Sequence, residues 1–480
     1  MGQALLLLFV FTVLVACKPG GPNPTPSNEG KNSINNPWWT TTGELEKDSD
    51  GNVIFNDVEI ALTTVVAGED LAPFQELVAG FNAEYSGEIY ITVTSLNQLG
   101  YEQTVTDQII NNSNAPDLIM SHQKGHSAFA GNKVIQPFDE AMEKSGIVLS
   151  MNDYSASLGQ YASLGYEGYT FGVPIDAQSE VVYYNKQLLD KYSDDGLPSN
   201  REELLKICKK VKDGEGITPI SWSTSQTFFP SYVFTTAIVQ NGGHFFDEDF
   251  RADWYDNIEN RSAISNAIAS IKELIDLGYA QVGKAESAAL NDFLSNKALF
   301  FLGLPWNLNS IIQAYGQQNG NLSEEAVMAD RVGGTSLANW FAMNGETENS
   351  EKVFGDSHFF AMSNTVTDIN KKAAICKFIS WFTQEGDVGA AWAEAGHVSA
   401  STYILNSESY QSNNIVSNYI NSFYSDINQF ECSGLTPYYA DTFSNLNALF
   451  AETIRVETNQ VEEIIKSKQD TVNAIVDFFG

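Results

Sequence analysis

The chain has 480 residues, of which 43% are hydrophobic, and its formal net charge is −34 at pH 7. This length favours two or three domains built on an ordinary hydrophobic core. The acidic side chains are spread along the chain, as on a solvated surface. They argue against nucleic-acid binding, which needs basic patches, and to a lesser degree against a strongly anionic ligand.

The first 16 residues are expected to be a secretory signal peptide. Leu5 to Val15 is almost continuously apolar but too short to span a bilayer, which takes about 20 helical residues. The residues Leu14-Val15-Ala16-Cys17 resemble a bacterial lipobox, in which the cysteine receives diacylglycerol, although no basic residue precedes the apolar run. We therefore expect lipidation at Cys17. A cleaved signal followed by an incidental cysteine is the alternative.

Residues 17–54 are expected to form a lipid-anchored, flexible tether. The segment after Cys17 is rich in Pro, Gly, Asn and Ser and holds few large apolar residues, so it cannot bury enough surface to fold. No later segment is long and apolar enough to span a membrane. The other cysteines, Cys208, Cys376 and Cys432, are widely spaced and indicate neither a disulfide framework nor a zinc site.

From residue 58 onward, short apolar runs alternate with amphipathic stretches. The first part predicts strands at 58–63, 88–94 and 117–120, and helices at 70–85 and 101–111. Later elements are strands at 180–184 and 298–302 and helices at 200–211, 261–277, 371–383 and 459–479. We expect the helix 200–211 to end near Gly214 and the helix 261–277 to stop at Gly278. This alternation favours a mostly parallel α/β layer.

Several sequence blocks, taken in order, carry a family resemblance. They are APDLIM, FGVPIDAQSEVVYYNKQLL, FTTAIVQNGGHFFD, NKALFFLGLPW and KFISWFTQEGDVGAAWAEAGHVSA. Together they resemble the extracellular solute-binding proteins of sugar ABC transporters, the group that includes maltose-binding protein. The resemblance covers roughly residue 58 to the C-terminus.

The resemblance implies an α/β fold with two lobes, each a mostly parallel sheet flanked by helices, and a ligand cleft at the hinge. The N-terminal lobe would comprise residues 55–175 plus about 360–405, and the C-terminal lobe residues 176–359 plus about 406–480. The hinge would lie near Pro174–Asp176. Closure of such lobes is stabilised by the contacts that a ligand adds in the closed state.

The function implied is that of a substrate-binding lipoprotein of an ABC importer, anchored at the cell surface or periplasmic face. It would capture a mono- or oligosaccharide and deliver it to the permease, as a monomer, without cofactor or catalysis. One alternative is a non-sugar solute such as a polyamine, peptide or nucleoside, since the acidic balance suits a cation. Another is a surface glycoside hydrolase, which needs two carboxylates about 5–10 Å apart across the cleft.

Trp306 is the main candidate for a ligand contact. The run Ala298–Leu302 ends in Gly303, and Trp306 follows three residues later. Ligands of open α/β sheets bind beyond the carboxyl ends of strands, and an indole can take the flat face of a sugar ring. In the family this Trp contacts sugar. The alternative is a Trp that only packs.

The resemblance also implies further ligand contacts, each with packing as the alternative. These candidates are Gln123, Asp176, Gln178, Trp222, Ser225, Phe228, Trp340, Tyr439 and Phe443. A metal site at His122 and His126 is not expected, because Gly125 should disrupt the intervening helix and no third ligand is evident.

Overall fold

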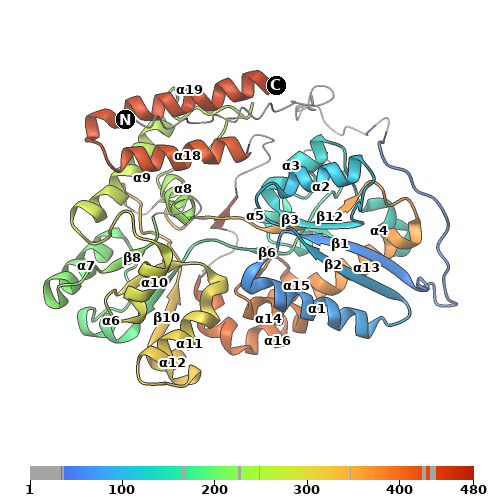
Figure 1. Ribbon diagram of the computed structural model, residues 1–480, viewed down its shortest axis with the longest axis horizontal. Helices are drawn as coiled ribbons and strands as arrows, with labels where there is room; N and C mark the ends of the chain where they lie inside the picture. The colour runs from blue at the N-terminus through green and yellow to red at the C-terminus, as the bar shows by residue number, and fades with distance from the viewer. Residues whose placement is uncertain are drawn as a thin grey trace, which may run out of the picture.

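The chain folds into two lobes, each a β-sheet surrounded by helices, which lie side by side along the long axis of the molecule (Figure 1). The computed structural model describes residues 34, 37–164, 166, 168–224, 229–247, 249–345, 347–423, 429–432 and 439–479. The two-lobed α/β architecture that the resemblance implied is confirmed. The signal peptide and Cys17 lie outside the described residues.

The N-terminal lobe is built on a sheet of strand order β2-β1-β3-β12-β4, with β5 beside β12. β1 is parallel to both β2 and β3, as the alternation of strands and helices indicated, whereas β12 is antiparallel to β3. Its strands are β1 (Val58–Thr64), β2 (Ile89–Ser95), β3 (Leu118–His122), β4 (Ile135–Gln136), β5 (Val173–Pro174) and β12 (His358–Ser363). Its helices are α1 (Leu71–Glu84), α2 (Tyr101–Ile110), α3 (Gln123–Gly131), α4 (Asp139–Ser145), α5 (Ala156–Gly159), α13 (Ile369–Gln384) and α14 (Gly386–Glu394).

The C-terminal lobe contains a sheet of order β10-β7-β9-β8. Only β8 and β9 are parallel; β7 is antiparallel to both of its neighbours, so this sheet is mixed rather than mostly parallel. The strands are β7 (Val181–Asn185), β8 (Ile220–Trp222), β9 (Phe300–Gly303) and β10 (Val332–Thr335). The helices are α6 (Lys186–Tyr192), α7 (Arg201–Glu215), α8 (Phe229–Gln240), α9 (Ile258–Asp276), α10 (Glu286–Leu294), α11 (Leu308–Gln318), α12 (Glu324–Asp330), α18 (Tyr439–Thr453) and α19 (Val461–Phe479).

The chain crosses between the lobes more than once. It leaves the first sheet after β5, forms β6 (Asp176–Ala177), and enters the second sheet at β7. It returns from β10 through β11 (Val353–Phe354) to β12. After α14, β13 (Val398–Ser399) pairs with β6. The remaining segments are α15 (Thr402–Leu405), α16 (Glu408–Ser412), the π-helix Val416–Ile420, α17 (Asn421–Phe423) and β14 (Phe430–Glu431), which pairs with β11.

Two helices end near the glycines at which they were expected to stop. α7 ends at Glu215, close to Gly214 as expected, and its C-cap is Gly216, whose φ of +69° lies in the left-handed region. The missing side chain of Gly214 lets the ring of Tyr192 pack closely, because a Cβ there would lie 2.4 Å from the Tyr192 oxygen. α9 stops before Gly278, as expected.

Residues 37–54, the end of the segment expected to be a tether, pack against the N-terminal lobe. Trp38 donates its indole N–H to Ile135 O at 2.8 Å and stacks on Phe171 with ring centroids 5.8 Å apart. Thr42 forms a parallel bridge with Asp368. In the part of the chain that the structure describes, no helix has both the length and the apolar character needed to cross a membrane.

Candidate ligand-binding site at the lobe junction

Trp306 lies where the two lobes meet. β9 ends at Gly303, and Pro305 then opens a 3-10 turn, Pro305–Asn307, that leads into α11. Gly396, which follows α14 of the other lobe, lies against this turn, since a Cβ on it would be 2.4 Å from Pro305 C and 2.5 Å from Trp306 N. The half-buried indole is nearly parallel to the ring of His397, with centroids 6.2 Å apart. The strand end thus places an aromatic face at the junction, and the contact of Trp306 with a ligand stays a prediction.

A second contact between the lobes is a hydrogen bond between side chains. Ser310 Oγ on α11 donates to Glu69 Oε2 at 3.1 Å. Glu69 belongs to a 3-10 turn, Gly68–Asp70, immediately before α1. Since Glu69 and Ser310 come from different lobes, this bond must break when the lobes separate.

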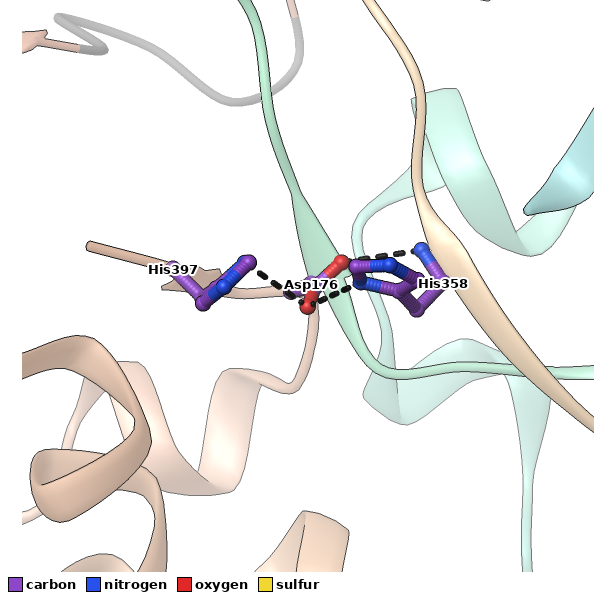
Figure 2. A group of neighbouring side chains, drawn as sticks. All are labelled: Asp176, His358 and His397. Carbon is purple, nitrogen blue, oxygen red and sulfur yellow. Dashed lines mark hydrogen bonds and ion pairs between the residues drawn. The ribbon is translucent and has the colours of Figure 1, made fainter. Parts of the chain in front are cut away.

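A buried network centred on Asp176 connects segments that are far apart in the sequence (Figure 2). Asp176 Oδ2 accepts hydrogen bonds from His358 Nδ1 and Trp392 Nε1, both at 2.9 Å. Asp176 Oδ1 accepts the backbone N–H of His358 at 2.9 Å. His397 Nδ1 lies 3.2 Å from the same Oδ2, within ion-pair range but outside hydrogen-bond geometry. β6, β12, α14 and the segment before β13 are therefore joined at one carboxylate.

The contacts of His358 indicate how its ring is oriented towards Asp176. Gln178 Nε2 lies 3.4 Å from His358 Nε2. With the amide in this orientation, its nitrogen can only donate, so His358 Nε2 accepts and the ring proton sits on Nδ1, where it is donated to Asp176. Asp176 is thus held by the Nδ1–H of His358 on one side and by His397 on the other.

The carboxylates around His397 favour its positively charged form. Burial alone would lower the pKa of His397, but the nearby carboxylates of Asp176 and Asp70 outweigh it and raise the pKa to about 10. Asp70 Oδ2 lies 3.5 Å from His397 Nε2. Burial would likewise raise the pKa of Asp176, but His358 and His397 hold it well below its ordinary range. The flat face of Trp392 covers the imidazolium, with centroids 4.1 Å apart and an angle of 2° between the rings.

His122 lies against this network, and its Nδ1 has no hydrogen-bond partner among the described residues. Its ring stacks on that of His358 with centroids 4.9 Å apart. Burial, followed by the charge of Lys124, holds the pKa of His122 well below its usual value, so the ring is neutral. Lys124 itself forms an ion pair of 2.9 Å with Asp356, next to the crossing strand β12.

Asp176, His358 and His397 each offer one ligand atom, and these atoms lie within 4.8 Å of one another. Two histidines and a carboxylate form a donor set that suits Zn²⁺. However, the N–H groups of His358 and Trp392 already donate to Asp176 Oδ2, and the high pKa of His397 favours its protonated form. A metal ion would have to displace both donors and a proton, so the hydrogen-bonded arrangement does not fit a metal site.

We therefore expect neither Zn²⁺ nor EDTA to change the melting temperature of the purified protein. Differential scanning fluorimetry with and without each additive measures this. A rise in melting temperature with Zn²⁺ that the His358→Gln variant lacks would contradict the expectation, because it would assign the gain to this cluster.

Three of the aromatic candidates are buried within the C-terminal lobe. Trp340 is 2% exposed and lies edge-on to Phe300, with centroids 5.1 Å apart. Phe443 stacks on Phe354 with centroids 5.5 Å apart. Trp222, the last residue of β8, belongs to the same core. In this structure the rings of Trp340 and Phe443 take the packing role that was the alternative to a ligand contact. The ring of Trp222 also packs, but its buried indole N–H has no hydrogen-bond partner among the described residues.

The polar candidates lie close to the junction but are buried. Gln178 donates to His358 and its backbone bridges to Asp356, while Asp176 is occupied by the network described above. Gln123 is fully buried as the first residue of α3. Ser225 and Phe228 lie outside the described residues, and so does the side chain of Tyr439, the first residue of α18.

The expectation that Gly125 disrupts a helix is wrong. α3 runs through it, and Glu102 packs where a Cβ would otherwise sit, 2.5 Å from Glu102 Oε1. His122 nevertheless belongs to the end of β3, while His126 Nε2 lies 3.2 Å from Phe359 O. The two histidines therefore have different surroundings.

Sequence reasoning missed His358, His397, Trp392 and the buried Glu180. The chain has only five histidines, and all but His244 are buried. That scarcity was a signal, because a buried histidine usually has a partner. No local spacing, however, links residues separated by about 180 positions.

The comparisons with known proteins agree with the fold. The family model described as bacterial extracellular solute-binding protein matches residues 67–388, more than half of the chain. The sn-glycerol-3-phosphate-binding periplasmic protein UgpB of Shigella dysenteriae is 25% identical over 138 residues, which cover 27% of this chain and only 31% of that relative.

Two solved structures show the same fold over most of the chain. The GacH receptor of Streptomyces glaucescens, described unliganded and with acarbose, has a TM-score of 0.66 and 16% identity, covering 87% of this chain and 98% of its own. The sugar-binding protein MalE of Xanthomonas citri has a TM-score of 0.70 and 13% identity, covering 88% and 99%. Together with the family match, the two lobes and their junction lead to one conclusion: this chain belongs to the bacterial extracellular solute-binding proteins.

Proposed function

We propose that the chain is the substrate-binding lipoprotein of an ABC importer, which captures a mono- or oligosaccharide between its lobes and delivers it to a membrane permease without chemical change. The observation that carries the proposal is the half-buried indole of Trp306 at the end of β9, facing the other lobe. The sugar ligands of the similar structures, acarbose among them, support the carbohydrate class. Cys17 would hold the protein to the membrane as a monomer.

The alternatives make different demands on the junction. A polyamine, peptide or nucleoside would use the same hinge with different contacts. A glycoside hydrolase needs one carboxylate in contact with the scissile bond and a second across from it. Asp176, the carboxylate at the centre of the junction, already accepts several N–H donors and is fully buried, which does not suit proton transfer to a substrate.

Addition of the correct sugar should stabilise the protein. A ligand at about 100 times its Kd adds roughly 2.7 kcal/mol to the free energy of unfolding by mass action. Thermal unfolding with a panel of mono- and oligosaccharides measures this, with sorbitol at equal concentration as a control for non-specific solute effects. Small-angle scattering should show a smaller radius of gyration with the same sugar. A panel without any shift beyond the sorbitol control would contradict the proposal.

A further inference from the structure

Glu180 is a buried carboxyl group at the N-terminal end of β7, where the C-terminal sheet faces the other lobe. It directly precedes β7, and Val181 pairs with Gly303, so Glu180 lies where the chain leaves β9 towards Trp306. The residue is 1% exposed, and neither carboxyl oxygen has a hydrogen-bond partner among the described residues. Buried polar groups are nearly always paired in native proteins, so an unpaired carboxyl at a lobe junction points to a missing partner.

A second unpaired group lies beside it. Trp222 ends β8, and its indole N–H is buried and likewise without a hydrogen-bond partner in the described part of the chain. Burial raises the pKa of Glu180 well above its ordinary value, an effect that the nearby indole N–H of Trp222 partly offsets. The indole N–H is thus close enough to favour the charged form of the Glu180 carboxyl, but the two groups do not have the geometry of a well-aligned hydrogen bond. The two carboxyl oxygens of Glu180 and the indole N–H of Trp222 can therefore bind a ligand at the same place.

The surroundings of Glu180 are acidic. Glu286 opens α10 and raises the pKa of Glu180 further, while burial and then the charge of Glu69 raise the pKa of Glu286 itself. Glu69 comes from the N-terminal lobe, so carboxyl groups of both lobes meet here. The nearby cation Lys284 is paired with Asp292 on α10. A ligand with a positive charge would relieve this accumulation of carboxyl groups, whereas a neutral ligand would not.

We propose that Glu180 and Trp222 bind an amino sugar, with the protonated amine of the ligand held by the Glu180 carboxylate. The inference rests on the proposed carbohydrate function and narrows its substrate class. The ammonium group donates to the two carboxylate oxygens, the indole N–H of Trp222 donates to a hydroxyl of the ring, and Trp306 covers the ring face. Where Glu180 is protonated before binding, its proton leaves to solvent as the ammonium arrives, so binding is accompanied by proton release.

Calorimetric titration of matched ligand pairs at pH 6 tests the inference. The pairs are glucosamine with glucose, galactosamine with galactose, and the glucosamine trisaccharide with cellotriose. In at least one pair the amino sugar should bind about 10- to 100-fold more tightly, the range of a hydrogen bond to a charged group. The binding heat of that sugar should vary with the ionisation enthalpy of the buffer, as proton release requires.

The Glu180→Gln variant keeps the size of the side chain and removes its charge. It should lose this preference and bind the neutral partner of the pair as the wild type does. Glu215→Gln, at the exposed end of α7, is the matched control and should keep the preference. Because the wild-type comparison and the proton release need no variant, a folding defect in Glu180→Gln would not prevent the test.

The outcomes separate the two proposals. If neutral sugars bind and no amino sugar binds more tightly, or if Glu180→Gln folds and keeps the preference, the amino-sugar inference is wrong and the carbohydrate function stands. If spermidine binds and no sugar does, the ammonium chemistry is right, but both the carbohydrate function and the amino sugar are excluded. If nothing in the panel binds, both proposals fail.

Discussion

Replacing Asp176 by Asn is expected to lower the free energy of unfolding by about 3–5 kcal/mol, the cost of leaving one partner of a buried ion pair alone. The substitution keeps the size of the side chain but removes the charge that faces the protonated His397. It also turns one oxygen into an NH₂ group, which would meet either the Nδ1–H or the backbone N–H of His358. Since Asp176 joins β6, β12 and α14, the loss affects the junction of both lobes.

Urea unfolding followed by tryptophan fluorescence measures this effect. Asp213→Asn is the matched control, because Asp213 pairs with Lys209 one helical turn away on the exposed face of α7, where ion pairs contribute little. We expect the control to leave the urea midpoint unchanged. Equal midpoints for the two variants would contradict a stabilising role for the Asp176 network.

The directions of the two pKa shifts also predict how this loss of stability depends on pH. The pKa of His397 is raised from 6.5 to about 10, so its contribution to stability is complete below pH 6.5 and is lost as the pH rises towards 10. The pKa of Asp176 is lowered from 3.8, so its contribution is present above pH 3.8 and is lost as the pH falls below it. The difference in stability between wild type and Asp176→Asn should therefore be largest between pH 3.8 and 6.5 and shrink on either side.

The local elements of the fold were predictable because their causes are local. Alternating and helical apolar periods define β1, α1 and β2 within a residue or two. α9 ends just before Gly278, whose φ of +68° lies in the left-handed region that glycine adopts readily and that is typical of the residue after a helix. The place of Trp306 at a strand end was also readable, because Gly303 and Pro305 interrupt the apolar run.

The partners of Asp176 could not be predicted, because the topology of the crossings brings them together. His358 and His397 lie 182 and 221 residues further along the chain, and nothing in their immediate surroundings shows that both meet one carboxylate. The antiparallel pairing of β7 has a similar origin. β7 enters its sheet directly from the other lobe rather than through a local helical crossover, and the residues of a strand do not record that direction.

Burial was the second property that the sequence left open. Trp306 and Trp340 each follow a turn that contains glycine, and both were candidates for contact with a ligand. The structure separates them: Trp340 is enclosed by the C-terminal lobe, whereas Trp306 keeps part of its ring at the junction. The difference depends on whether the other lobe or the core of the same lobe lies opposite, which is a tertiary property.

Replacing Trp306 by Ala is expected to weaken sugar binding by about 2–3 kcal/mol, or roughly 30- to 150-fold in Kd, as for a central aromatic contact. Because the indole is only half-buried, the free energy of unfolding without ligand should change little. Trp306→Tyr, which restores an aromatic face, should recover part of the affinity. Calorimetric titration measures the affinities of the wild type and the two variants. The ligand is the sugar that raises the melting temperature most.

Trp340→Ala provides the matched comparison for the same change of residue. Its ring is buried against Phe300, so the substitution leaves a cavity and should cost about 3–5 kcal/mol of unfolding free energy. The fraction that remains folded should bind sugar with nearly the affinity of the wild type. If the two variants instead lose stability equally and Trp306→Ala keeps its affinity, the indole at the junction is a packing residue. The carbohydrate function would then lose the observation that carries it.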